Sequence, residues 1–136
     1  MKATSSHLMN EDVTAGVRVR VETQYQFAAS NPEQGIYVFA YRIHIKNLND
    51  GPVQLINRHW EISDSGHEAR TVDGAGVVGQ QPVLESGAEF VYVSGCQLGS
   101  CMGKMEGYYE MEDLITGKTF QVRIPAFTLE MPFRLN

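Results

Sequence analysis

Apolar and polar residues alternate along most of this chain. Apolar side chains recur at every second position from Val17 to Phe27 and again from Ile36 to Leu48, where aromatic and β-branched residues share one face. A period of two is typical of half-buried strands, and no segment shows the 3.6-residue period of an amphipathic helix. The pattern therefore predicts an all-β protein.

The alternation divides the chain into short segments separated by turns that contain glycine or proline. We predict strands over residues 17–27, 36–48, 53–63, 68–72, 81–84, 89–93, 105–111 and 119–124. Short strands at this spacing are typical of an antiparallel β-sandwich, here immunoglobulin-like and of about seven to nine strands. Asp50-Gly51 predicts a hairpin in which residues 53–63 return antiparallel to 36–48.

Residues 1–16 show no period and end at a glycine, so we predict a mobile N-terminal arm followed by one domain over residues 17–136. The formal net charge of −5 disfavours nucleic acid and anionic membranes as partners. The sequence contains neither a membrane-spanning apolar run nor a secretory signal, which predicts a cytoplasmic protein. Cys96 and Cys101 are then expected to be free thiols.

Gly74, Gly76 and Gly79 fit the G-x-G-x-x-G pattern of dinucleotide-binding loops. That motif requires a helix after it, and Pro82 opposes one. A tight glycine bend between strands is the favoured interpretation. Binding of a small anion or a nucleotide polyphosphate by this loop stays open as the alternative.

The remaining candidate chemistry is sparse. The two cysteines and the scattered histidines lack zinc-ligand spacing, so we predict no metal and no cofactor. Glu106, Glu110 and Glu112 share a strand face with Tyr108, which favours a solvated face over a cation site. No nucleophile–base pair is recognisable, so no catalytic residue is assigned and the protein is expected to be non-enzymatic.

Arg58 and Trp60 lie toward the end of the third predicted strand. A single Trp usually packs in a core, where it buries a large apolar area. A partner-binding surface is the alternative, because Trp and Arg are enriched at interfaces.

Several segments together resemble the ApaG family over residues 17–135. They are residues 37–41, 52–55, 58–60, 74–79 with Pro82, 92–95, 103–109 and 124–127. The resemblance implies an immunoglobulin-like, fibronectin type III-like sandwich without established catalytic activity. It also implies an interaction module, since such domains are found attached to F-box and polymerase-associated proteins, and a link to cobalt and magnesium homeostasis. Ser86 before Gly87, and Cys101-Met102 before Gly103, depart from the family pattern.

We therefore expect a domain that binds another protein of unknown identity. The expected surface is the loop at 74–79 together with the loop at 94–103, which begins at Ser94 and Gly95, because loops on a rigid scaffold commonly carry function. Strand addition at an exposed sheet edge is a second route. Anion binding and direct metal handling are the alternatives.

ATP, NAD and dinucleoside polyphosphates are predicted to bind with dissociation constants on the order of millimolar or worse, about −4 kcal/mol. No helix N-terminus faces the glycine loop, and no Lys or Arg lies between Thr71 and Gly103. Isothermal titration calorimetry measures these affinities. Micromolar binding that Gly76→Val abolishes in a folded variant would contradict the prediction.

Overall fold

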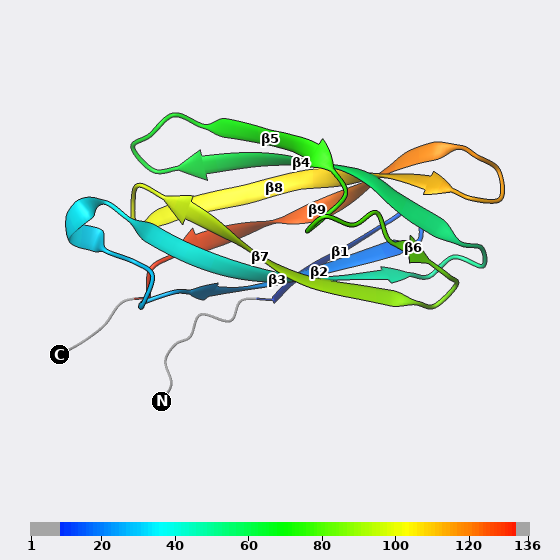
Figure 1. The fold of residues 1–136 in the computed structure, drawn as a ribbon, viewed down its shortest axis with the longest axis horizontal. Coiled ribbons are helices and arrows are strands. Elements are labelled where there is room, and N and C mark those ends of the chain that lie inside the picture. Colours follow the sequence, from blue (N-terminus) through cyan, green and yellow to red (C-terminus); the bar gives the residue numbers. More distant parts are fainter. Residues whose placement is uncertain (1–8, 133–136) are drawn as a thin grey trace.

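The structure is a computed structural model that describes residues 9–132, and it shows two antiparallel sheets packed face to face (Figure 1). The predicted all-β sandwich is confirmed. The strands are β1 (Met9–Thr14), β2 (Val17–Tyr25), β3 (Tyr37–Asn47), β4 (Val53–Asp64), β5 (Arg70–Ala75), β6 (Val83–Leu84), β7 (Glu89–Leu98), β8 (Met102–Asp113) and β9 (Thr119–Glu130). One 3₁₀ turn, η1 (Pro32–Gln34), precedes β3.

The strand order is β1-β2-β3-β7 in one sheet and β5-β4-β8-β9 in the other, where β6 also pairs with β4. No helix within residues 9–132 is long and apolar enough to cross a bilayer. The inward-facing positions of both sheets form one apolar core. Trp60 of β4 is 3% exposed and packs edge-on against Tyr41 of β3 and Phe127 of β9. The structure thus places Trp60 in the core.

The predicted N-terminal arm is wrong over residues 9–14, which form β1. This strand pairs with β2 from Met9↔Glu22 to Thr14↔Val17. The two-residue turn between them is Ala15-Gly16, and both residues have positive φ, as tight hairpins require. None of the β1 residues is fully buried, so the strand lacks the apolar alternation that marked the others. Residues 1–8 lie outside the described part of the chain.

The hairpin predicted at Asp50-Gly51 is also wrong, because β3 and β4 belong to different sheets. The connection crosses from one sheet to the other above the buried side chain of Asn47. The Asn47 amide donates to the carbonyl oxygens of Gly51 at 2.9 Å and Leu84 at 3.0 Å, and its oxygen accepts from the Asn49 N–H. These hydrogen bonds pair the carbonyls of Gly51 and Leu84 and the N–H of Asn49, backbone groups that lie where the chain passes from one sheet to the other.

A β-bulge changes the direction of side chains in β4. The register with β8 passes from Leu55↔Met111 to Asn57↔Glu110, so Ile56 is an extra residue. An extra residue reverses the alternation of side chains beyond it. Arg58 therefore lies on the inner face with Trp60, while Asn57 and His59 face outward.

Trp60→Ala is predicted to lower the free energy of unfolding by about 3–5 kcal/mol, because it leaves a cavity between the two sheets. Trp60→Phe retains part of the ring packing and should cost less. Urea unfolding of the three proteins measures both values. Equal stability of wild type and Trp60→Ala would contradict the core placement.

Candidate functional site

The two lateral sides of the sandwich differ. On one side β1 packs along β9: the Asn10 amide donates to the Ala126 carbonyl at 2.6 Å, and Arg123 lies 3.6 Å from the Asp12 carboxylate. On the other side the edge strands are β5 and β7, and they do not pair with each other. This second side, which we call the β5–β7 opening, is the candidate binding site.

The backbone N–H and C=O groups of successive β7 residues point alternately toward β3 and away from it. Asn47 N–H bonds the Ala88 carbonyl, so even-numbered residues of this segment face β3. The odd-numbered residues Val91, Val93 and Gly95 therefore direct their N–H and C=O groups away from the sheet. No partner for these groups exists within residues 9–132. Such a row is a template for another strand.

The side chains along this edge leave it accessible. Val91 and Val93 are 45% and 52% exposed on the outer face of the sheet, and Gly95 is exposed and has no side chain. No proline or lysine, which natural proteins use to block edges, occurs between Glu89 and Leu98. β7 is thus a long edge strand with a small, apolar outer surface.

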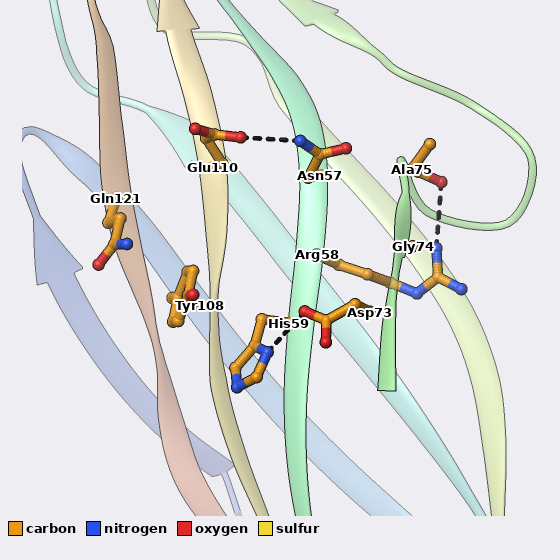
Figure 2. Close-up of a pocket in the computed structure, with 9 residues that line it drawn as sticks. All are labelled: Asn57, Arg58, His59, Asp73, Gly74, Ala75, Tyr108, Glu110 and Gln121. Atoms are coloured by element: carbon orange, nitrogen blue, oxygen red, sulfur yellow. Dashed lines mark hydrogen bonds and ion pairs between the residues drawn. The ribbon is translucent and has the colours of Figure 1, made fainter. Parts of the chain in front are cut away.

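Arg58 reaches the opening from below β5. Its Nη1 atom donates to the carbonyl oxygen of Ala75 at 3.1 Å (Figure 2) and to that of Gly76 at 2.8 Å. A Cβ atom at Gly74 would lie 2.9 Å from the guanidinium, so the glycine allows the side chain to pass. The sequence named Arg58 and Gly74 as candidates, and the structure brings them into contact.

Arg70 borders the same opening. Its Nη2 atom donates to the Gln97 carbonyl at 2.8 Å and lies 3.7 Å from Cys96 Sγ. Gln97 is odd-numbered, so this carbonyl belongs to the free edge of β7. Arg70 is not recognisable as a site residue from the sequence, where it is a lone cation within the weakly alternating strand predicted over residues 68–72.

The glycine segment forms a compact bend. Val77 and Gln80 exchange backbone hydrogen bonds across the two-residue turn Val78-Gly79, in which both residues have positive φ. The Gly76 N–H donates to the Ile56 carbonyl. These bonds occupy N–H groups that an anion-binding loop would need free, and the carbonyl oxygens of Ala75 and Gly76 accept hydrogen bonds from Arg58.

The expected binding loop at 94–103 is shorter than predicted. Ser94, Gly95 and Cys96 belong to β7, which continues to Leu98, and only residues 99–101 connect it to β8. Asp64 fixes this connection by accepting from the Gly99 N–H at 2.7 Å and the Ser100 hydroxyl at 2.6 Å. Burial opposes ionisation of Asp64, but these hydrogen bonds prevail and lower its pKa. Cys96 is buried, Cys101 is exposed, and both are free thiols.

A buried tyrosine cluster lies behind the opening. The hydroxyl groups of Tyr92 and Tyr109 form a hydrogen bond between the sheets at 2.5 Å. Burial raises the pKa of Tyr92, Tyr109 and Tyr41, and the nearby positive charge of Arg58 opposes each rise. Arg58 thus contributes positive charge to this side of the core.

A polar groove of about 440 Å³ occupies the outer face of the β5-β4-β8-β9 sheet (Figure 2). His59 stacks on Tyr108 with ring centroids 4.9 Å apart, and its Nδ1 atom lies 2.6 Å from Asp73. Asn57 donates to Glu110 at 2.7 Å. Most polar groups of this groove are thus engaged with one another. No cluster of metal-ligating side chains occurs within residues 9–132.

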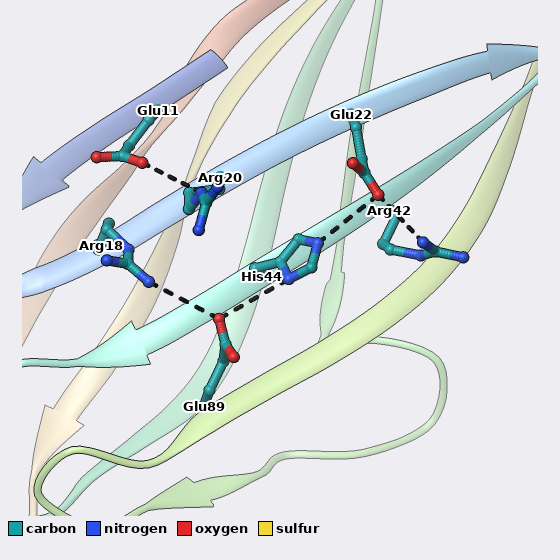
Figure 3. Close-up of polar contacts among 7 residues, drawn as sticks. All are labelled: Glu11, Arg18, Arg20, Glu22, Arg42, His44 and Glu89. Carbon is teal, nitrogen blue, oxygen red and sulfur yellow. Dashed lines mark hydrogen bonds and ion pairs between the residues drawn. The ribbon is translucent and has the colours of Figure 1, made fainter. Parts of the chain in front are cut away.

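The outer face of the other sheet carries a ladder of ion pairs (Figure 3). Glu22 pairs with Arg42 at 3.1 Å, and Glu11 pairs with Arg20 at 3.2 Å. His44 lies between Glu22 and Glu89, 3.8 Å from each. Charges of both signs alternate here, which is the behaviour of a solvated face.

Two antiparallel sheets packed face to face define a β-sandwich domain. Comparison with known proteins assigns its family. The model of the ApaG domain, DUF525, matches residues 27–113. The chain is 44% identical over 126 residues to Protein ApaG of Brucella suis, covering 91% of this chain and 95% of that protein. It is 43% identical over 120 residues to Protein ApaG of Proteus mirabilis, covering 88% and 95%.

A crystal structure of a putative ApaA protein from Bordetella pertussis superposes with a TM-score of 0.81 at 43% identity, covering 90% of this chain and 95% of that one. The chain belongs to the ApaG domain family.

His59 is predicted to titrate above its ordinary range, because hydrogen bonds to Asp73 and Glu61 raise the pKa of its imidazole. The associated stability is fully present below the unfolded pKa of about 6.5 and is lost as pH rises through the folded pKa. NMR titration of the His59 ring should give a lower pKa in Asp73→Asn. An unchanged pKa in that variant would contradict the contact.

Proposed function

We propose that this ApaG-family chain is a cytoplasmic, non-enzymatic protein-binding domain that takes an extended segment of its partner as an additional strand on β7. The carrying observation is the row of unpaired backbone groups at Val91, Val93 and Gly95. Main-chain hydrogen bonds supply affinity in strand addition, and side-chain contacts supply specificity. The free thiols of Cys96 and Cys101 fit a reducing compartment.

The position of the edge supports this proposal over the loop surface expected from the sequence. The glycine bend presents carbonyls that Arg58 already occupies, and the connection at 99–101 is held by Asp64. By contrast, Val91 and Val93 offer exposed β-branched side chains beside free backbone groups. An added strand would cover the valines and satisfy those groups together.

Val93→Pro is predicted to abolish strand addition while preserving the fold. The Val93 N–H faces solvent, so proline removes no bond of the β3–β7 ladder, and proline is tolerated on edge strands. Val93→Ala keeps the N–H and serves as the matched control. Nonapeptides selected on the full chain from a random displayed library should bind wild type and Val93→Ala, and bind Val93→Pro at least about tenfold more weakly.

Amide hydrogen exchange locates the bound peptide. Exchange at Val91, Val93 and Gly95 should slow when the peptide binds, because their N–H groups become hydrogen-bonded. Equal peptide affinity for wild type and Val93→Pro, or selection of no peptide, would contradict the proposal. Analytical ultracentrifugation provides a further test: a dimer broken by Val93→Pro would mean that a second copy of this chain occupies the edge.

A further inference from the structure

The six arginines within residues 9–132 fall into two groups. Arg18, Arg20, Arg42 and Arg123 lie on outer faces, and each has a carboxylate oxygen within 4.0 Å. Arg58 and Arg70 lie at the β5–β7 opening, and neither forms an ion pair within residues 9–132. Their hydrogen-bond partners are backbone carbonyls and the Cys96 sulfur.

Because the partners of Arg58 and Arg70 are not carboxylates, N–H donors and positive charge stay available at the opening. A guanidinium group has five N–H donors in a planar fork, and the bonds to carbonyls use one nitrogen of Arg58 and one of Arg70. Carbonyl oxygens carry only partial charge, whereas a carboxylate forms charge-assisted, often bidentate bonds that are roughly twice as strong. The opening is therefore complementary to an anion.

We infer that the strand bound by β7 carries two acidic side chains on its inward-facing positions, directed to Arg58 and Arg70. This inference rests on the strand addition proposed above. Side chains of neighbouring strands lie side by side on the same face of a sheet. An added strand would thus place one set of side chains beside Val91 and Val93, and the other set on the inner side, beside Tyr92, Ser94 and Cys96.

The positions of the two arginines along β5 define the spacing. Arg58 lies opposite Gly74 and donates to the carbonyls of Ala75 and Gly76, whereas Arg70 is the first residue of β5, four residues before Gly74. Side chains on one face of a strand recur at every second residue, so four residues are two such repeats. The partner motif therefore has two acids four residues apart, with apolar residues directed to the outer surface of Val91 and Val93.

The selected nonapeptides test this motif directly. Among peptides that require the Val93 N–H, Asp or Glu should be enriched at two positions four residues apart. Replacing those acids by their amides should weaken binding to the wild-type chain by about tenfold or more, as expected for loss of hydrogen bonds to a charged group. The preference should also fall as salt rises.

A double-mutant cycle assigns the preference to the opening. In Arg70→Gln, an exposed position, the loss caused by the amide peptide should shrink to below about threefold. Arg58→Gln should act similarly, with circular dichroism confirming that it is folded. Arg123→Gln removes the same charge from β9, the edge strand opposite to β5, where Arg123 is paired with Asp12, and should leave the full preference.

The outcomes separate the two proposals. Peptides that need the Val93 N–H but show no acidic enrichment would overturn the inference and leave strand addition standing. An acid preference that survives in both Arg70→Gln and Arg58→Gln would overturn it as well. Peptides that bind Val93→Pro as well as wild type, or a selection that yields none, would contradict strand addition, and the inference with it.

Discussion

Two sheets packed face to face have four edge strands, and each edge presents backbone groups that need hydrogen-bond partners. This requirement organises the whole molecule. β1 and β9 meet it together, with Asn10 reaching Ala126 and the Thr14 hydroxyl accepting from the Arg123 N–H. β5 and β7 meet it only in part, through two arginine side chains that occupy the carbonyls of Ala75 and Gln97. The remaining free groups of β7 are those to which we propose that a partner strand binds.

Three irregular features of the chain lie around the Arg58 side chain. The bulge at Ile56 turns Arg58 inward, and Gly74 leaves space for its guanidinium to pass beneath β5. The bend at Gly76 and Gly79 then presents a carbonyl to that guanidinium. The glycines that match a dinucleotide-binding motif in the sequence thus leave space for the Arg58 side chain and present a carbonyl acceptor to it. Similar spacing arises because close backbone approach and positive φ both require glycine.

The sequence allowed most strands and the core to be predicted, because alternation is strong wherever one face is buried. Trp60 and the inward face of β3 follow from this rule. It could not find β1, whose polar residues are all partly exposed, nor the crossing from β3 to β4, which depends on the buried amide of Asn47 contacting Leu84, distant in sequence. Arg58 was recognisable as a candidate. Arg70 and the free edge of β7 were not, since an edge is defined by strand order and not by local pattern.

The closure of β1 on β9 also has a kinetic consequence. Asn10 and Ala126 are 116 residues apart, so this contact joins the two ends of the domain. Contacts of such long separation require a large loss of chain entropy before they form, which slows folding of sandwiches. While the closure is incomplete, β1 and β9 add two further unprotected edges to those of β5 and β7. The nascent domain is therefore most prone to association between chains in the interval before its ends meet.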